Sequence, residues 1–351
     1  MIKMLLCGFF VLIMIISGFV GYLKTKTVDD FVIGNRNVGP WLSAFAYGTT
    51  YFSAVLFIGY AGKVGLPALW IAIGNAFFGS FLAWKILAKP TRKITAELNV
   101  RTMPEFLAVR YSSTFYKYLS GIMIFVFFVP YSASVYMGLS YFFEAVFNLP
   151  YIYALLIMAG LTTIYLLLGG YHAVALMYFI KCLIMILGVF LMLFFLINTP
   201  NVGGVAEIGT RLREIKPEFV SLWGGNNFSK LIFLMLLTSL GTWGLPQMVQ
   251  KFYAIKDENA IKPATYVSSF FALIIAGGAY LTGALTPLFF KTMPLDPVLM
   301  KPSPDLIIPQ MIANHIPAWV AALILLLVLS ASMSTLSSLV LVSSSAVCVD
   351  L

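Results

Sequence analysis

Hydroxyl side chains gather inside an apolar stretch near the C-terminal end of the sequence. The stretch 317–347 is hydrophobic, yet it contains the run Ser330-Ala331-Ser332-Met333-Ser334-Thr335-Leu336-Ser337-Ser338. Several of its serines recur at helical spacing, which places them on one side of a helix: Ser330, Ser334, Ser337, Ser338 and Ser345. Hydroxyl oxygens on one side of a helix can coordinate a hard cation. Close packing of helices through small residues is the simpler reading of the same pattern.

Two other apolar stretches are interrupted by residues that bend a helix. Residues 48–53 read Gly-Thr-Thr-Tyr-Phe-Ser, and residues 241–246 read Gly-Thr-Trp-Gly-Leu-Pro. In transporters built from inverted repeats, paired broken helices hold substrate and ion sites, because freed carbonyls and half-helix ends face the ligand. Counting five helices from the first interruption puts the second one on the first helix of a second repeat. Ordinary Gly and Pro kinks, which are common in membrane helices, are the alternative.

Residues suited to enzymatic chemistry are scarce. The two histidines, His172 and His315, fall in different predicted loops on opposite sides of the membrane, and no H-E-x-x-H or G-x-S-x-G motif is present. Cys7, Cys182 and Cys348 lie in separate apolar stretches, without the spacing of a disulfide framework or a metal site. We therefore do not expect an enzyme.

The composition identifies the environment in which these residues must act. The chain has 351 residues, of which 61% are hydrophobic and 10% charged, and its mean hydropathy is +0.95. Soluble domains are about 45–50% apolar and about 25% charged. A soluble enzyme and a disordered chain are therefore excluded, and the sequence predicts an all-α polytopic membrane protein.

About 20 apolar residues span a bilayer, and nine such segments are predicted. They cover 4–23, 41–62, 66–88, 118–146, 151–169, 173–197, 231–252, 265–290 and 317–347. The first segment is read as a spanning helix rather than a signal peptide, because no small-residue cleavage site precedes a polar start. The one sizeable outer loop, 198–229, is expected to hold an amphipathic surface segment.

The formal charge of +9 is explained by orientation in the membrane. The basic residues lie between hydrophobic blocks rather than on one basic face, so no nucleic-acid partner is indicated. With the N-terminus outside, the inner loops hold thirteen Lys and Arg residues against eight outside. Lys251 is counted in an inner loop, and Lys181 is the one clear charge placed within a span. The positive-inside rule therefore predicts an outer N-terminus and an inner C-terminus.

Short motifs along nearly the whole chain occur in the order found in a known family. They include Asp30-Phe31-Val32-Ile33-Gly34-Asn35-Arg36, Ser53-Ala54, Thr102-Met103-Pro104-Glu105-Phe106, Leu168-Gly169-Gly170, Gly244-Leu245-Pro246 and Met333-Ser334-Thr335-Leu336-Ser337. With these motifs the chain resembles the sodium:solute symporter family, the group of sodium/proline and sodium/pantothenate symporters.

The resemblance implies a LeuT-type inverted-repeat fold that works by alternating access. Residues 1–351 would form a single transmembrane domain of about nine helices. Residues 1–30 would hold an extra N-terminal helix, 38–197 the first five-helix repeat and 230–351 part of the second repeat. Because the last two helices of that repeat are missing from the sequence, we expect the chain to be a fragment, truncated in the second repeat.

The resemblance also implies the positions of the binding residues. A sodium ion would be bound by the backbone carbonyls of Thr49, Phe52 and Ala331 and by the hydroxyls of Ser334 and Thr335. The solute would lie beside it, near the middle of the membrane. The candidates for binding it are Thr50, Tyr51, Ser53, Thr238, Thr242 and Trp243, although Tyr51 and Trp243 fit equally well as packed core aromatics.

The sixth predicted span departs from the family pattern. The family usually has an acidic residue and, three positions on, an amide near the sodium path, whereas this chain has Tyr178 and Lys181. Lys181 could extend to the membrane surface, bind an anionic substrate, or serve as a tethered cation beside the sodium site. The last role would replace sodium coupling by proton coupling, since burial makes proton release from a lysine easier.

The expected function is therefore secondary active transport of a small organic solute, with Na⁺ or H⁺ as coupling ion and no other cofactor. The expected location is the plasma (inner) membrane, with the lipid bilayer as surroundings and without an obligate protein partner. A membrane sensor domain joined to a signalling module is the alternative of another class. The solute itself is not identified by the residues; the helix ends favour an organic acid or amino acid.

Overall fold

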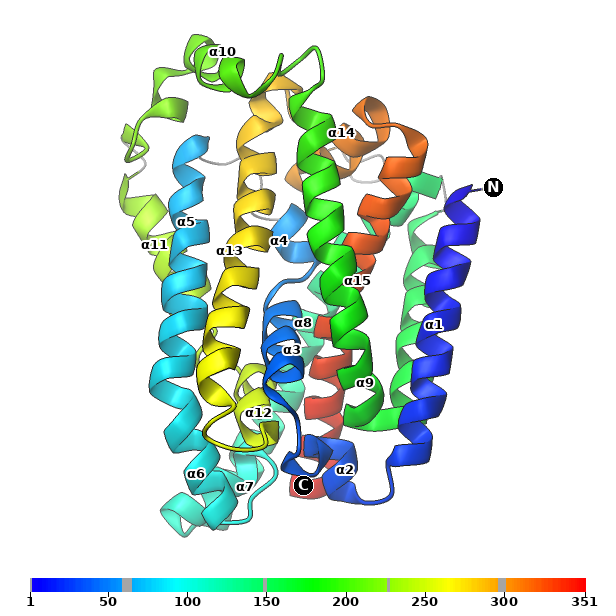
Figure 1. Cartoon of the computed structure of the whole chain (residues 1–351), viewed down its shortest axis with the longest axis vertical. Helices are drawn as coiled ribbons and strands as arrows, with labels where there is room; N and C mark the ends of the chain where they lie inside the picture. The colour runs from blue at the N-terminus through cyan, green and yellow to red at the C-terminus, as the bar shows by residue number, and fades with distance from the viewer. Residues whose placement is uncertain (1, 59–64, 148–149, 226–227, 296–300) are drawn as a thin grey trace.

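The computed structural model describes residues 2–58, 65–147, 150–225, 228–295 and 301–351. Within these ranges the chain is mostly helical, with loops between the helices, and it forms no β-strand beyond isolated bridges. The long helices run alongside one another, parallel to the long axis of the molecule (Figure 1). The predicted all-α architecture is confirmed.

Apolar helices form the body of the molecule. Five helical runs in the described residues are long and apolar enough to cross a membrane: Leu66–Glu97, Thr114–Phe147, Met177–Ile197, Ile261–Leu288 and Ala318–Asp350. The first of these runs includes α5 (Leu69–Gly74), the π-helical η3 (Asn75–Leu82) and η4 (Trp84–Ala88), and α6 (Lys89–Glu97). The other four belong to α8 (Thr114–Phe147), α9 (Tyr151–Ile197), α13 (Ile261–Leu285) and α15 (Ala318–Ser345). Each run overlaps a span predicted from hydropathy.

The N-terminal helix α1 (Ile2–Lys24) packs along α9. The predicted spans 151–169 and 173–197 both fall within α9, whose apolar parts are Ile152–Ile164 and Met177–Ile197. Short 3₁₀ segments lie between the longer helices: η1 (Gly34–Arg36), η2 (Leu66–Ala68), η5 (Val205–Glu207), η6 (Pro217–Val220), η8 (Thr286–Leu288) and η9 (Pro304–Leu306). The π-helical η10 (Ala346–Asp350) directly continues α15.

Both predicted interruptions break a helix. The first separates α3 (Pro40–Tyr51) from α4 (Ala54–Ile58), with Phe52 in an extended conformation at φ −109° and ψ 127°. The second separates α11 (Phe228–Leu240) from α12 (Pro246–Ala254), where Pro246 opens the new helix. Proline suits a first helical turn, because the N–H that it lacks would have no helical partner there.

The serine-rich helix α15 occupies the centre of the bundle. It packs against α8, α9, α1 and α3, and 94% of its most apolar 18-residue window is buried inside the protein. Small Ser and Ala side chains let neighbouring helices approach it closely. The serine stripe therefore serves helix packing whatever else it does.

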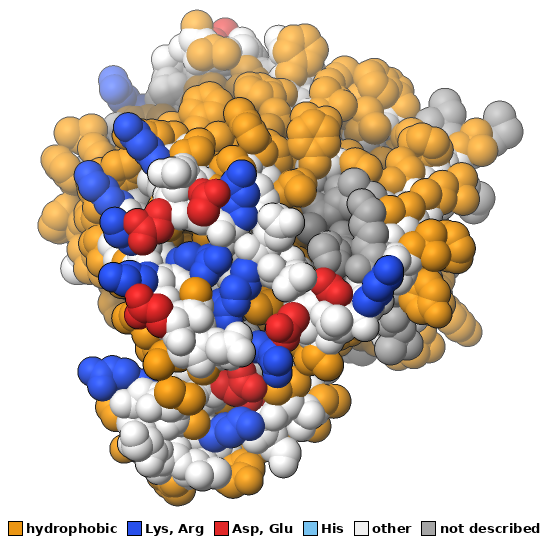
Figure 2. Space-filling view, turned by 60° about the horizontal axis from the view of Figure 1, so that its bottom comes forward, with side chains coloured by type: hydrophobic (Ala, Val, Ile, Leu, Met, Phe, Trp, Pro, Cys, Tyr) orange, Lys and Arg blue, Asp and Glu red, His pale blue; other side chains and the backbone are white. Residues whose placement is uncertain are grey.

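The two ends of the bundle carry different short elements (Figure 1). At the bottom lie α2 (Val28–Ile33), α6, α7 (Met103–Tyr111) and α12, whereas α10 (Ile208–Ile215) and α14 (Ile307–His315) lie at the top. Helix α10 has the predicted amphipathic character, because Ile208 and Leu212 pack against Val202 and Leu285. Figure 2 shows that Lys and Arg side chains gather on the bottom face, mixed with acidic ones.

Candidate functional site

Five oxygen atoms converge where α15 passes the break between α3 and α4. The Ser334 hydroxyl lies 2.6 Å from the Thr49 carbonyl oxygen and 2.8 Å from that of Ala331. The Thr335 hydroxyl lies 3.2 Å from the Ala331 carbonyl oxygen and 3.4 Å from that of Phe52. The structure thus brings together all five residues of the predicted cation site.

The break explains why these carbonyls are available. Helix α3 ends at Tyr51, so the carbonyls of its last turn lack the N–H partners that a continuing helix would supply. They point toward α15, and the Thr50 carbonyl oxygen lies 3.1 Å from the Thr335 hydroxyl. Thr49, Ser334 and Thr335 are 0% exposed. The helix dipole adds negative potential at this end.

The donor set indicates which ion such a site suits. It consists of neutral carbonyl and hydroxyl oxygens, which hard cations prefer. In the part of the chain that the structure describes, no group of three or more His, Cys, Asp or Glu residues could hold a metal ion. A cluster of neutral oxygens fits a monovalent hard cation such as Na⁺ better than a transition metal.

A cavity of about 240 Å³ adjoins this oxygen cluster through Phe52. It lies between the two broken helices and the helical run 66–97. Its lining combines apolar residues with a few uncharged polar ones: Tyr51, Phe52, Val55, Leu56, Asn75, Leu237, Thr238, Gly241, Thr242, Leu245 and Tyr280. None of these described lining residues is charged.

Three of the six predicted solute-binding residues, Tyr51, Thr238 and Thr242, line this cavity. The other three lie elsewhere. The Thr50 hydroxyl is 3.2 Å from that of Ser338, and the Ser53 hydroxyl accepts a hydrogen bond from the Val55 amide.

Trp243 also points away from the cavity. Its indole N–H donates to the Phe78 carbonyl oxygen at 2.9 Å, and the side chain packs with the aromatic cluster around Tyr47 and Trp84. Its role in the structure is therefore that of a packed core aromatic.

Asn75 is a cavity residue that the sequence analysis missed. Its amide oxygen accepts hydrogen bonds from the hydroxyls of Thr238 at 2.9 Å and Ser239 at 3.0 Å. The Tyr51 hydroxyl donates to the Thr238 carbonyl oxygen at 2.8 Å. These bonds tie α11 to η3 and α3 to α11. An amide within the apolar stretch 66–88 was the signal available in the sequence.

Lys251 lies inside the protein, not in a loop as the charge count assumed. It is 0% exposed, and its ammonium donates to the Tyr178 hydroxyl at 2.9 Å and the Ser338 hydroxyl at 3.1 Å. It also lies 5.3 Å from the centre of the Tyr171 ring. The placement differs because α12, which follows the second break, turns into the core.

Lys181 is also 0% exposed, so its side chain does not extend to the surface. The reading of Lys181 as a residue that reaches the membrane surface is therefore wrong. It is also not the one charge within the helices, since Lys251 is buried as well. Two buried lysines thus lie inside the bundle, and Lys251 contacts the serine stripe at Ser338.

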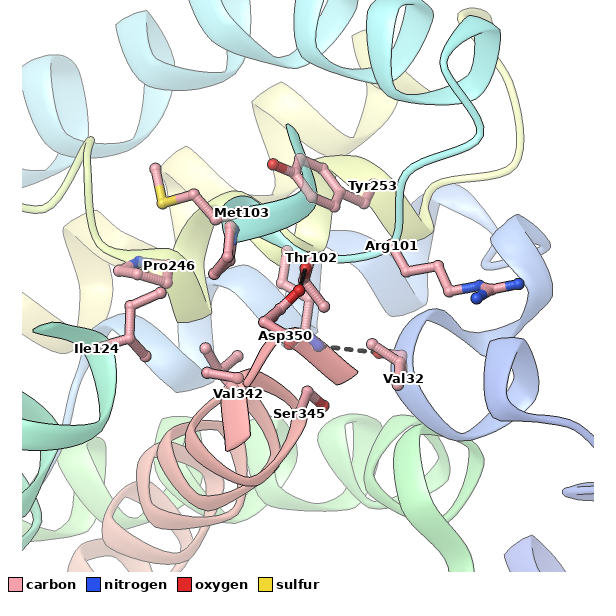
Figure 3. A pocket seen from close by; sticks show the side chains of 13 residues that line it. Val32, Arg101, Thr102, Met103, Ile124, Pro246, Tyr253, Val342, Ser345 and Asp350 are labelled. Carbon is pink, nitrogen blue, oxygen red and sulfur yellow. Dashed lines mark hydrogen bonds between the residues drawn. The ribbon is translucent and has the colours of Figure 1, made fainter. Parts of the chain in front are cut away.

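A smaller cavity of about 20 Å³ lies at the bottom end, where α2, α7, α8, α12 and α15 with η10 meet (Figure 3). The Thr102 hydroxyl donates to the Asp350 carboxylate at 2.8 Å, which joins α7 to η10. The Gln250 amide donates to the Val32 carbonyl oxygen at 2.8 Å, which joins α12 to α2. Arg101 forms an ion pair with Asp29. These contacts join the helices that meet at the bottom end.

Comparison with known proteins gives consistent results. The model of the sodium:solute symporter family matches residues 31–351. A sodium/proline symporter of Salmonella typhimurium is 30% identical over 349 residues, which cover 96% of this chain and 68% of that protein. The osmoregulated proline transporter OpuE of Bacillus subtilis is 30% identical over 353 residues, with 98% and 70% covered.

Among solved structures, the chain resembles a substrate-bound, outward-open state of a Na⁺-coupled sialic acid symporter. The TM-score is 0.78 and the identity 18%, and the match covers 100% of this chain and 73% of that one. At this identity the likeness establishes the LeuT-type fold. Because the family model covers most of the chain, the protein is a transporter, not an enzyme, and it belongs to the sodium:solute symporter family.

Proposed function

We propose that this protein carries a small zwitterionic solute, proline or a close analogue, across the membrane together with sodium by alternating access. One observation carries the sodium part of the proposal. The carbonyls of Thr49, Phe52 and Ala331 and the hydroxyls of Ser334 and Thr335 converge at a helix break, buried from water. A dehydrated Na⁺ needs such a preformed shell of oxygens.

The lining of the 240 Å³ cavity supports a solute without net charge. A net charge buried among uncharged side chains would carry a large desolvation cost. A zwitterion carries two opposite charges, and the ends of the broken helices can match both of them. The C-terminal end of α11 is negative, and the N-terminal end of α12 is positive. The apolar lining from Phe52, Val55 and Leu56 suits a ring such as that of proline, the substrate in the names of the relatives.

The contact of Phe52 with both sites supports coupling between ion and solute. Its carbonyl belongs to the oxygen cluster, while the residue itself lines the cavity. Ion binding would therefore order the backbone that shapes the solute site. Coupling of ion and solute also requires that the ion bind one access state more tightly than the other. One cation moving down 100 mV supplies about 2.3 kcal/mol, enough for roughly forty-fold accumulation of a neutral solute.

Proton coupling through Lys181 is a second candidate mechanism. Its supporting observation is the burial of both Lys181 and Lys251, of which Lys251 donates to Ser338 of the serine stripe. A buried ammonium that gives up its proton during the cycle would act as a tethered cation in place of sodium. This mechanism predicts uptake that needs little sodium, responds to an inward proton gradient and loses that response in Lys181→Gln.

We further propose that the bottom end faces the cytoplasm, in the plasma (inner) membrane, with the N-terminus outside. Helices α2, α6 and α7 at the bottom end lie in segments between predicted spans that the positive-inside rule assigns to the inner side. Helix α12, also at the bottom end, leads into another such segment. In this orientation the Thr102–Asp350 hydrogen bond and the Arg101–Asp29 ion pair would lie at the inner exit.

Uptake by purified protein in proteoliposomes tests both mechanisms. Radiolabelled proline should accumulate with an inward sodium gradient at constant pH, and unlabelled proline should compete more strongly than a sugar or a dicarboxylate.

The matched variant Thr238→Val keeps the side-chain volume but loses the hydroxyl, so the KM for the solute should rise severalfold. Sodium-independent uptake driven by a proton gradient would replace the sodium mechanism, and absence of proline transport would overturn the assigned solute.

A further inference from the structure

We propose that a groove between η4 and α6 on one side and the start of α13 on the other binds the headgroup of an anionic phospholipid. The groove has a volume of about 470 Å³ and lies at the bottom end of the bundle (Figure 1). Its charged lining consists of Lys85, Lys89, Lys262 and Glu258. The proposed transport function uses none of these residues.

The charges of the groove favour an anion. Lys89 is neutralised by Glu258, whose carboxylate lies 2.8 Å from its ammonium. Lys85 and Lys262 remain as exposed cations, and the Lys85 ammonium lies 5.5 Å from the centre of the Phe81 ring. Lys262 stands in the first turn of α13, where the helix dipole adds positive potential. A phosphate group between them would meet two ammonium groups, whereas the start of α13 is already capped by Asp257, whose carboxylate accepts from the Ala260 amide at 2.8 Å.

An apolar surface leads directly into the groove. On α13, Tyr266 is 58% exposed and Phe270 66% exposed, and the spacing of four residues places them on one helix face. Across from them, Phe77 stacks on Phe81, whose ring centre is 6.1 Å from that of Tyr266. In a membrane protein such a surface contacts acyl chains.

The combination selects a lipid over a soluble anion. A free phosphate would use only the lysines, whereas a phospholipid places its headgroup in the groove and its chains along Phe77, Tyr266 and Phe270. The predicted span 66–88 ends at the groove, so the lysines lie at the depth of the headgroups. Basic pockets between membrane helices on the inner side are suited to anionic lipids.

The groove also joins the two halves of the fold. Lys85 and Lys89 belong to the first predicted repeat, and Lys262 belongs to the second. Because alternating access moves the repeats relative to each other, a bound lipid would stabilise the arrangement in which the lysines lie close together.

Native mass spectrometry of the purified protein, titrated with phosphatidylglycerol or phosphatidylcholine, tests the proposal. The wild type should bind phosphatidylglycerol at least tenfold more tightly than phosphatidylcholine. The double variant Lys85→Gln/Lys262→Gln should lose that preference, whereas Lys85→Arg/Lys262→Arg should retain it. The matched control Lys216→Gln/Lys301→Gln removes two exposed lysines from loops outside the groove and should leave the preference unchanged.

Three results would overturn the proposal. The first is equal binding of both lipids by the wild type. The second is an equal loss of preference in the groove variant and the control, which would indicate a general effect of net charge. The third is displacement of phosphatidylglycerol by millimolar glycerol phosphate, which would make the groove a site for soluble phosphates. Melting temperatures of all variants, measured alongside, identify any loss caused by unfolding.

Discussion

At the scale of single residues, the serines of α15 have different tasks although their spacing is the same. Ser334 faces the carbonyl of Thr49 across the helix interface, whereas Ser337 donates to the Met333 carbonyl of its own helix. Ser338 meets Thr50, Tyr178 and Lys251. The neighbour across the interface, not the position in the stripe, decides which hydroxyl is available to an ion.

We predict that Ser334→Ala combined with Thr335→Ala raises the sodium concentration for half-maximal uptake tenfold or more, on the order of 1.4 kcal/mol. Two of the oxygens that converge at the α3 break would be lost. Ser337→Ala is the matched control, since this hydroxyl is equally buried but bonds within its own helix. An unchanged sodium dependence in the double variant would leave Ser334 and Thr335 with a packing role only.

The buried charge of Lys251 leads to a second prediction at this scale. Its ammonium adjoins Ser338, one helical turn from Ser334, so it opposes the binding of another cation nearby. Lys251→Met should therefore lower the sodium concentration for half-maximal uptake about fivefold, on the order of 1 kcal/mol. Lys251→Arg keeps the charge and should leave it close to the wild-type value. Weaker sodium binding in Lys251→Met would show that the lysine supports the site.

At the scale of elements, the arrangement of helices brings the two breaks and η3 together. Tyr51, at the end of α3, reaches across to donate to Thr238 near the end of α11. It can do so because Gly79 of η3 has no side chain. A Cβ at Gly79 would collide with the Tyr51 hydroxyl. The solute cavity therefore depends on a close approach of η3 to α3.

We predict that Gly79→Ala displaces Tyr51 and raises the KM for the solute about tenfold while changing the sodium dependence much less. The physical reason is that Tyr51 lines the cavity, whereas the oxygen cluster uses backbone atoms and the hydroxyls of α15. Gly277→Ala on α13 is the control, because a Cβ there meets no atom within 4 Å. Equal KM values for the two variants would contradict the proposed role of the Tyr51 contact.

At the scale of the whole molecule, the bottom end is closed by contacts from several helices. Thr102 and Asp350 join α7 to η10, and Gln250 joins α12 to α2. The cavity above them holds about 20 Å³, room for a single water-sized group. We infer that the described arrangement is closed at the bottom end.

We predict that Asp350→Ala weakens this closure and increases exposure of the bottom cavity. In a background without native cysteines, Ser345→Cys should react severalfold faster with a thiol reagent supplied from the inner side when Asp350→Ala is present. Lys93→Ala, which removes only an exposed contact with Glu97, should leave the rate unchanged. Equal rates in all three proteins would mean that Asp350 does not hold the end closed.

The orientation of the molecule is tested in the same background. Lys93 is exposed at the bottom end, and the positive-inside rule places it in the cytoplasm. Lys93→Cys should therefore resist an impermeant thiol reagent applied to intact cells and react after permeabilisation, whereas Lys216→Cys should react in intact cells. The reverse pattern would invert the topology.

Local patterns in the sequence determined the helical fold, five long apolar runs and both helix breaks. Apolar length and the Gly and Pro residues at 241–246 act within a few positions along the chain, so they are readable without a structure. The predicted oxygen cluster came from motifs that resemble those of a family, because spacing alone left the serine stripe open to a packing role.

The tertiary structure decided which residues meet across the bundle. Asn75 reaches the cavity because η3 packs on α11, and Lys251 is buried because α12 turns inward after its break. Thr50 and Trp243 were directed to other partners by the same packing. Such contacts join positions far apart in the chain, and a helix period reports only which side of its own helix a residue occupies, not which neighbour covers that side.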